Sequence, residues 1–265
     1  KGVESPNNAG TVTPEAIEIA RALQNGEQKA ILLGNAVAHH AQASTLLAIA
    51  NWIGAQTGAT VGFLTEAANT VGAQWAGALP GANGLNAGQM LAGGVKAAIL
   101  LNTEPAFDSA AGADALKSCD MVVSLSPFKA NMDIADVLLP VTPFTETSGS
   151  FVNAEGRLQS FHAVVKPLGD ARPAWKVLRV VANLLGVAGM DFESSQDVLA
   201  VVSRSQSQVP AELLSNSTKT NMAVSAPATQ EPVVASIYQL DGIVRRAPSL
   251  QMTADARQSS EVVAP

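Results

Sequence analysis

Short, uninterrupted apolar segments recur along the first half of the chain, and each ends at residues that commonly stop a strand. Residues 30–33 are followed by Gly34 and Asn35, and residues 97–101 are followed by Asn102. An apolar run of four or five residues without alternation is typical of a strand buried on both faces of a parallel sheet. Helical patterns separate these runs, so the chain is expected to form successive βαβ units.

The same reasoning places further strands and helices. Strands are expected at residues 61–64, 121–125 and 136–140, and helices at residues 14–25, 46–57, 85–91, 109–116 and 173–185. Thr13 before Pro14 and Glu15 marks the first helix start, and Trp175, Leu178, Val181 and Leu185 are expected to face inward on the last helix. With right-handed crossovers, the pattern predicts an α/β fold: a Rossmann-like, doubly wound, mostly parallel sheet with helices on both faces.

The chain is expected to contain one α/β domain, residues 1–202, followed by an irregular C-terminal extension. Within the domain, residues 142–170 are rich in Thr, Ser, Gly and Asn and are expected to form a long loop. Residues 203–235 are polar and predict a linker. Residues 236–265 contain a short apolar cluster and predict a tail that docks back. The first residues include neither an initiator Met nor a signal-like apolar core, so we expect a piece of a longer protein.

Composition argues against several functions. Only 14% of the residues are charged, the net charge is −6, and the cations form no stripe, so nucleic acid is not an expected partner. Every apolar run is far shorter than the roughly 20 residues that cross a bilayer, so no direct membrane insertion is expected. Cys119 is the single cysteine, which rules out an internal disulfide and an iron–sulfur cluster held by four thiolates of this chain. It also fits a reducing, cytoplasmic compartment.

No catalytic residue and no metal site are predicted from the motifs. His39 and His40 are adjacent and therefore diverge on a helix, which makes them a poor metal pair, and His162 accompanies no nucleophile motif. A GxGxxG fingerprint follows none of the expected strands, so NAD binding is disfavoured. Residues 145–159 combine glycines with Asn153, Glu155 and Arg157. This polar stretch is either a ligand clamp or a loop that satisfies its own hydrogen bonds.

Several segments resemble the molybdopterin oxidoreductase superfamily. The similar stretches are residues 135–140, 144–149 and 151–159, extended by residues 167–175 and by the turn at residues 102–105. Together they cover about residues 30–190. In catalytic members of the superfamily, strand-end loops hold a pterin dinucleotide. The resemblance assigns that role, if such a cofactor binds, to Gly34, Asn35, Asn102, Glu104, Asn153, Glu155 and Arg157.

Residues 143–147, 160–162, 165–167 and 238–248 are most similar to the large peripheral iron–sulfur subunit of bacterial respiratory complex I, the NADH:quinone oxidoreductase. That resemblance implies iron–sulfur clusters elsewhere in the subunit, which carry electrons from NADH and flavin toward quinone. It implies no cofactor in this chain, a non-catalytic structural role, and other peripheral-arm subunits as partners. It also implies a cytoplasmic location, peripheral to the inner membrane.

Two other functions remain open. The chain could be a pterin-binding fragment of an active molybdopterin oxidoreductase such as a formate dehydrogenase. It could also be a stand-alone dinucleotide-binding module, which the missing glycine fingerprint disfavours.

Overall fold

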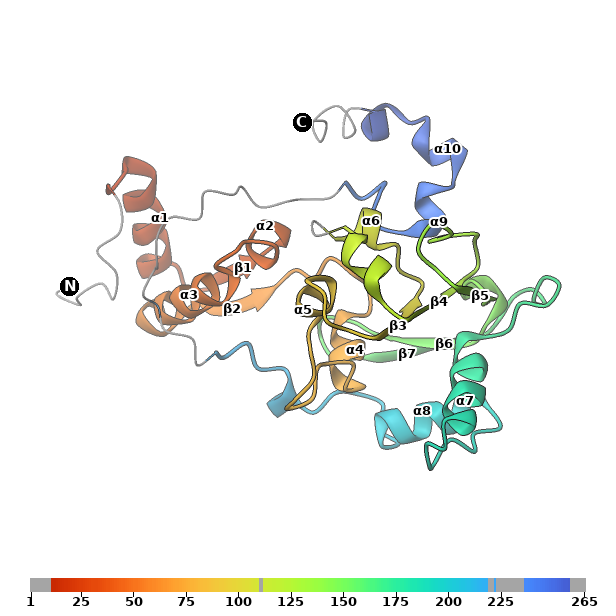
Figure 1. The fold of residues 1–265 in the computed structure, drawn as a ribbon. Helices are drawn as coiled ribbons and strands as arrows, with labels where there is room; N and C mark the ends of the chain where they lie inside the picture. The colour runs from red at the N-terminus through yellow and green to blue at the C-terminus, as the bar shows by residue number, and fades with distance from the viewer. Residues whose placement is uncertain (1–10, 110–111, 219–221, 223–235, 258–265) are drawn as a thin grey trace. The chain divides into compact units, whose positions relative to one another are not determined.

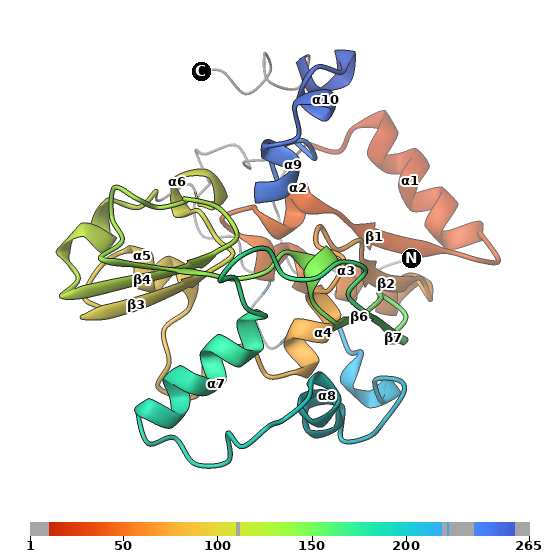
Figure 2. The same cartoon turned by 90° about the vertical axis from the view of Figure 1, so that its right-hand side faces the viewer.

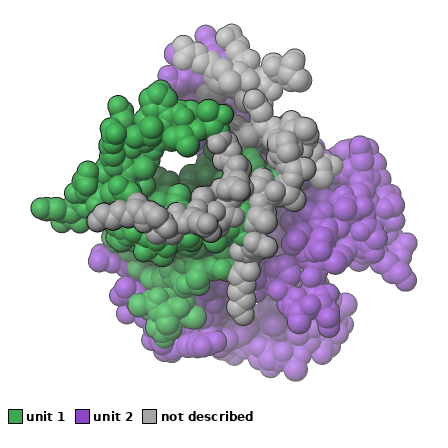
Figure 3. All heavy atoms as spheres, turned by 90° about the vertical axis from the view of Figure 1, so that its left-hand side faces the viewer, with its two compact units in different colours: residues 1–71, 153–156, 209–234 green, residues 72–152, 157–208, 235–265 purple. Residues whose placement is uncertain are grey.

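The computed structural model describes residues 11–109, 112–218, 222 and 236–257, which divide into two compact units (Figure 3). Unit 1 comprises residues 1–71, 153–156 and 209–234, and unit 2 comprises residues 72–152, 157–208 and 235–265. Each unit contains its own parallel sheet (Figure 1). The α/β class with mainly parallel strands, expected from the sequence, is therefore confirmed.

Unit 1 opens with helix α1, Pro14–Asn25. Thr13 caps it, because its side-chain oxygen accepts a hydrogen bond from the Ala16 N–H at 3.2 Å. Proline occupies the first helical position, where its missing N–H costs nothing. The chain leaves the helix at Gly26, so the start and end predicted from the sequence are both confirmed.

The sheet of unit 1 has two strands, β1 (Ala30–Leu33) and β2 (Thr60–Phe63), which pair in parallel with Ala30 opposite Thr60. The connection between them contains α2 (Asn35–Ala38) and α3 (Ala43–Thr57). Gly54 of α3 lies against β2, since a Cβ on it would come within 2.7 Å of the Val61 side chain. Gly58 ends α3 with a left-handed backbone, φ +75°. Small residues therefore let the helix pack closely on the strands.

The sheet of unit 2 has three parallel strands in the order β3 (Ala97–Leu101), β4 (Met121–Ser126) and β5 (Val137–Pro140). The central strand β4 is the most buried. Its Val122 packs with Leu100 and Leu116 in the core, and α5 (Ala87–Leu91) contributes Leu91 to the same cluster. All five strands predicted for the two sheets are present, but in the described residues they form ladders of two and three strands.

A β-hairpin was missed by the sequence prediction, which assigned residues 142–170 to a loop. Strands β6 (Gly149–Val152) and β7 (Leu158–Phe161) pair antiparallel, with Gly149 opposite Phe161. The Phe151 and Phe161 rings stack with centroids 5.4 Å apart. Gly149 is needed where it stands, because an added Cβ would lie 2.6 Å from the Phe161 ring. The contact between the two rings across the strands stabilises a hairpin whose strands are only four residues long.

The remaining elements are short helices. They are α4 (Thr70–Trp75), α6 (Pro105–Asp108), η1 (Asp114–Ser118), η2 (Phe144–Glu146), α7 (Ala174–Leu184), α8 (Ser195–Ser203), η3 (Ala211–Leu213), α9 (Gly242–Arg245) and α10 (Pro248–Gln251). Figure 2 shows α7 and α8 joined by an extended segment.

Two helical predictions need correction. The helix predicted at residues 109–116 is wrong, because Gly112 takes a positive φ of 66° and the chain forms separate short turns before and after it. Leu185 was expected to face inward on the last helix, but it lies past the end of α7 and is 74% exposed. The end itself, with Gly186 at φ +73°, is as predicted.

Part of the predicted linker, residues 219–221 and 223–235, lies outside the described residues. The described part of the same segment contains η3. Over the described ranges, none of the helices combines the length and apolar character that crossing a bilayer requires.

Candidate functional site

The candidate residues of unit 1 follow β1 and occupy the tip of the β6–β7 hairpin. The Gly34 carbonyl accepts hydrogen bonds from the N–H groups of Val37 and Ala38 at 3.0 and 3.1 Å. Nothing lies within 4 Å of a Cβ built on Gly34, so packing does not demand glycine there. Asn35 begins α2, and its carbonyl accepts the His39 N–H at 2.9 Å. These two residues form a compact turn at the carboxyl end of the strand.

At the hairpin tip, Asn153 and Glu155 take part in a local turn. The Asn153 Oδ1 atom accepts the Glu155 N–H at 3.1 Å, and the Asn153 carbonyl accepts the Gly156 N–H at 2.9 Å. Gly156 has φ +82° and packs against Val209, so glycine is required at this position. Arg157 leaves the tip through an isolated bridge to Gln208 in unit 2. Of the two alternatives for this polar stretch, the local bonds favour a loop that satisfies itself.

A histidine–carboxylate pair lies in the same unit. His39 Nε2 and Glu66 Oε2 are 2.5 Å apart, and both side chains are partly exposed. His40 instead accepts the Gln42 N–H on Nδ1 at 2.9 Å. The two histidines therefore have different partners. Among the described residues, no cluster of three or more His, Cys, Asp and Glu side chains could hold a metal ion.

In unit 2, Asn102 follows β3 with a left-handed backbone, φ +50°, a conformation that Asn tolerates better than most residues. Its N–H extends the ladder to β4 by donating to the Leu125 carbonyl at 2.9 Å. Asn131 then fixes the turn, since its Nδ2 donates to the Thr103 carbonyl and to the Ser124 hydroxyl. Ser124 is fully buried. The strand-end turn is thus held rigidly by polar contacts.

Glu104 is the buried carboxylate of this turn, with 7% of its surface exposed. Its Oε1 accepts Arg246 Nη1 at 2.7 Å and Arg245 Nη2 at 3.3 Å, and its Oε2 accepts Arg246 Nη2 at 2.8 Å. Both arginines belong to the C-terminal tail, at α9. Figure 1 shows α9 beside α6, at the end of the sheet where β3 stops. The tail therefore engages both oxygens of this candidate ligand group.

Asp108 completes an ion cluster of two carboxylates and two guanidinium groups. Its Oδ1 accepts Arg245 Nη1 at 2.8 Å, while its Oδ2 accepts the Glu104 N–H at 2.7 Å. The guanidinium of Arg245 lies 5.1 Å from the Phe107 ring centroid, and that of Arg246 lies 4.5 Å from the Phe128 ring centroid. Charge pairing and ring contacts act together, which is how buried charges are normally compensated.

The same contacts set the protonation of the cluster. The hydrogen bond from Arg246 lowers the pKa of Glu104, and burial opposes this shift without cancelling it. The pKa of Arg246 is raised, chiefly by its hydrogen bond to Glu104. Glu104 is therefore an anion at neutral pH and neither a proton donor nor an available base. The sequence identified Glu104 through the family resemblance, but it gave no sign of its partners, which lie 141 and 142 positions away.

These contacts also test whether the turn suits a pterin dinucleotide. A carboxylate that grips such a ligand needs a free oxygen for the donor groups of the ring. Both oxygens of Glu104 already accept guanidinium hydrogen bonds, two on Oε1 and one on Oε2, so a ligand would have to compete with Arg245 and Arg246. In this conformation Glu104 does not fit the ligand role that the resemblance assigns to its position.

Comparison with known proteins places the chain in a family. Residues 13–184 match the family model for molybdopterin oxidoreductase. The chain is 28% identical, over 92% of its length, to the mitochondrial 78 kDa subunit of NADH-ubiquinone oxidoreductase from Neurospora crassa, and covers 34% of that protein. It is 42% identical over 67 residues to the probable oxidoreductase YjgC of Bacillus subtilis. It is 37% identical over 70 residues to a putative formate dehydrogenase of Staphylococcus aureus.

The chain spans about a third of the Neurospora protein and 7% of each of the two bacterial relatives. The family match, in contrast, extends from the first helix to the end of α7 and includes both parallel sheets. The chain belongs to the molybdopterin oxidoreductase family.

Proposed function

We propose that this chain is a non-catalytic structural part of the bacterial NADH:quinone oxidoreductase, within the subunit that carries electrons from NADH and flavin through iron–sulfur clusters toward quinone. The similarity to the 78 kDa subunit supports the proposal, because it runs over 92% of the chain. Matches to the formate dehydrogenase-like proteins cover only about a quarter of it.

The observation that carries the non-catalytic assignment is the engagement of Glu104. Its two oxygens accept three hydrogen bonds from Arg245 and Arg246, so the strand-end turn is occupied by the chain's own tail. An active pterin site would need this edge of the sheet open to a ligand. The ion cluster therefore favours a scaffold in which the former ligand edge stabilises the fold.

The proposal also covers cofactors, partners and location. The iron–sulfur clusters would lie outside these 265 residues, since such clusters are usually held by four cysteines and Cys119 is the only one here. The Cys119 thiol instead donates a hydrogen bond to the Val95 carbonyl at 3.3 Å. The partners would be other peripheral-arm subunits of complex I. The location would be cytoplasmic, peripheral to the inner membrane through those subunits, with no nucleic acid bound.

The alternative function is a pterin-binding fragment of an active molybdopterin oxidoreductase such as a formate dehydrogenase. The two bacterial relatives favour it, because their identities of 42% and 37% exceed the 28% of the longer match. In that case the turn at Glu104 would have to release Arg245 and Arg246 before a ligand could bind.

One experiment separates these functions. The full-length native polypeptide is purified with its accompanying subunits and assayed for molybdenum, tungsten, pterin, iron and flavin. The proposal expects iron and flavin in the assembly with neither molybdenum, tungsten nor pterin. Molybdenum or tungsten near one per chain, together with pterin, would overturn it and establish the alternative.

A further inference from the structure

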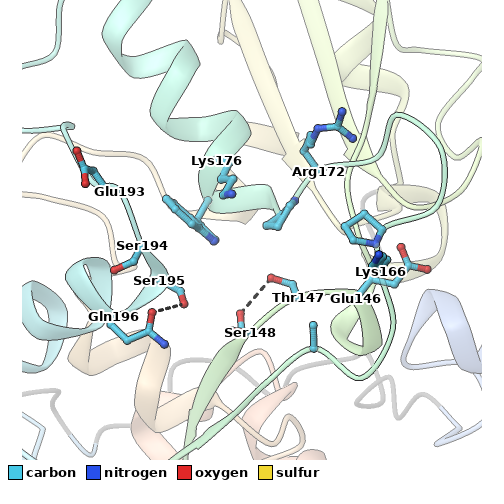
Figure 4. Close-up of a pocket in the computed structure, with 14 residues that line it drawn as sticks. Glu146, Thr147, Ser148, Lys166, Arg172, Lys176, Glu193, Ser194, Ser195 and Gln196 are labelled. Atoms are coloured by element: carbon cyan, nitrogen blue, oxygen red, sulfur yellow. Dashed lines mark hydrogen bonds between the residues drawn. The ribbon is translucent and has the colours of Figure 1, made fainter.

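A cleft of about 600 Å³ lies in unit 2, away from the Glu104 cluster. Thr147 and Ser148, which directly precede β6, form one side, and Ser195 and Gln196 at the start of α8 form the other (Figure 4). Trp175, near the start of α7, is half-buried in its wall. The cleft therefore combines hydroxyl and amide groups with one large aromatic surface.

Two cations of this cleft are available to a partner. Lys166 and Lys176 are exposed, and within the described residues neither ammonium group has an acidic partner. Lys176 Nζ lies 5.4 Å from the Trp175 ring centroid. The chain as a whole carries a net charge of −6, whereas the lining of the cleft has three cations, Lys166, Arg172 and Lys176, and two carboxylates, Glu146 and Glu193, so the cleft is locally positive.

The two glutamates of the cleft form no ion pair with these lysines within the described residues. Glu146 accepts the Leu168 N–H on Oε2 at 2.9 Å, so its carboxylate is used to hold a loop. In Figure 4, Glu193 lies at the left of the view, far from both lysines, and Glu146 lies at the right, beside Lys166. Arg172 likewise serves the loop, since its Nη1 donates to the carbonyls of Gly169 and Ala171.

The segment from residue 162 to residue 172, here called the 162–172 loop, borders the cleft through Lys166 and Pro167. Its backbone is anchored, because the N–H groups of Val164 and Val165 both donate to the Thr145 carbonyl. Its side chains are nevertheless turned outward: Val164 is 78% exposed and Leu168 is 81% exposed. Figure 1 shows the segment between β7 and α7 projecting from the rest of unit 2.

An anchored backbone that displays apolar side chains beside unpaired cations and a tryptophan has the composition of a protein-binding surface. Apolar groups exposed together in this way mark interaction sites, and tryptophan is enriched among the residues that dominate binding energy. A preformed loop also lowers the ordering cost of association. A small anion would use the lysines but would leave Val164, Leu168 and Trp175 unused.

We propose that the cleft and the 162–172 loop form a docking surface for an acidic segment of another protein, one in which carboxylates alternate with apolar side chains. The carboxylates pair with Lys166 and Lys176, and the apolar side chains contact Trp175 and the loop. This inference rests on the proposed scaffold role, which calls for partner subunits, and it names the chemistry that one of them presents.

The test measures binding of a short fluorescein-labelled peptide, in which aspartate alternates with leucine, to the full chain by fluorescence anisotropy. A peptide with asparagine in place of aspartate is the first control. The expected result is saturable binding of the acidic peptide alone, weakened as NaCl rises from about 50 to about 500 mM, since salt screens exposed charges. Equal binding of both peptides, or no saturable binding, would overturn the proposal.

Paired variants locate the site. The double variant Lys166→Glu and Lys176→Glu should weaken binding at least about tenfold, whereas Lys96→Glu with Lys129→Glu, exposed lysines outside the cleft, should change it less than about twofold. Circular dichroism checks that both variants fold. Reversing two charges can disturb the surface, so Trp175→Phe and Trp175→Leu provide a second test that leaves the charges unchanged. The leucine variant should bind the acidic peptide more weakly than the phenylalanine variant, because it lacks the aromatic ring.

Three other outcomes contradict the proposal. They are equal weakening by the two lysine pairs, complete displacement of the peptide by about millimolar inorganic phosphate, and a concentration-dependent dimer of the chain that is lost in the cleft variant. The last two would assign the cleft to a small anion or to a second copy. The metal and pterin content of the native protein tests the scaffold role in a separate measurement. The proposed function and the docking surface can therefore be refuted independently.

Discussion

Replacing Glu104 with Gln tests how the tail is held. The substitution keeps the size of the side chain but removes its charge, so three charge-assisted hydrogen bonds to Arg245 and Arg246 are lost or weakened. Removing one partner of a buried ion pair costs about 3–5 kcal/mol when the other charge is left uncompensated. Here Asp108 still pairs with Arg245, and the Arg246 side chain, 35% exposed, regains water. We therefore expect a smaller loss, about 2–3 kcal/mol.

This loss should appear as opening of the tail, because all the broken contacts join α9 to the β3 turn. Trypsin cleaves after arginine, and Arg245 is 7% exposed at its side chain, so cleavage there requires opening. A loss of about 2–3 kcal/mol raises the open population about 30- to 150-fold, and the cleavage rate after Arg245 should rise in proportion. Lys96 precedes β3 and makes no contact in the cluster, so the rate of cleavage after Lys96 should stay at the wild-type value.

The matched control is Asp114→Asn, which removes the exposed ion pair with Lys117. Exposed pairs contribute little, so cleavage after Arg245 should stay at the wild-type rate. A rate in Glu104→Gln within about twofold of wild type would refute the reasoning, because it would mean that the ion cluster does not hold the tail closed. An equal rise after Lys96 would also refute it, since that would indicate general unfolding.

The remaining predictions concern pH, packing and the cleft wall. Because the pKa of Glu104 is lowered in the folded state, the stability that its ion pairs contribute is complete above the ordinary glutamate pKa and is lost as the pH falls through the lowered pKa. Hydrogen exchange of α9 should accelerate in that acidic range, and Glu104→Gln should remove this dependence of the exchange rate on pH. Leu125→Ala, near the end of the central strand β4 and 1% exposed, should cost about 2–5 kcal/mol in urea unfolding. Gly149→Ala should cost about 1–3 kcal/mol, because its Cβ would displace the Phe161 ring; an unchanged urea midpoint would contradict this. Trp175→Ala should cost only about 1–2 kcal/mol in the same assay, since its ring is half-buried.

The strands could be located from the sequence because burial on both faces leaves a local trace. The runs at residues 30–33 and 97–101 correspond to β1 and β3 without a shift at either end. The order of the strands in the sheets could not be predicted, because parallel strands are joined by long connections whose sequence does not say which strands become neighbours. The β6–β7 hairpin was missed for the opposite reason. Its strands are only four residues long and lie within a stretch rich in Ser, Thr and Gly, so no long apolar run marks them. Only the fold shows that Phe151, which is paired with Gln159, stacks on the diagonal Phe161 ring.

The candidate site shows a similar division. Family resemblance identified Asn102 and Glu104, and both are at the carboxyl end of β3, where a parallel sheet presents its ligand groups. The role of Glu104 could not be predicted, because its partners lie 141 and 142 positions along the chain and form no local pattern. Two adjacent arginines in a C-terminal tail usually indicate a solvated surface. Only the fold shows that they are placed over a buried carboxylate and between two phenylalanine rings.

The charge balance of this edge bears on whether it could take a pterin dinucleotide at all. With the tail in place, Glu104 and Asp108 face Arg245 and Arg246, so the cluster is neutral and its polar atoms are engaged with one another. With the tail displaced, the two arginines leave with it and the turn keeps two carboxylates. Like charges repel strongly where water is partly excluded, so that exposed edge would disfavour the pyrophosphate of a dinucleotide. With the tail in place a ligand would have to compete with two guanidinium groups for Glu104, and with the tail displaced it would meet two carboxylates. Both states therefore favour a retained scaffold over a cofactor site.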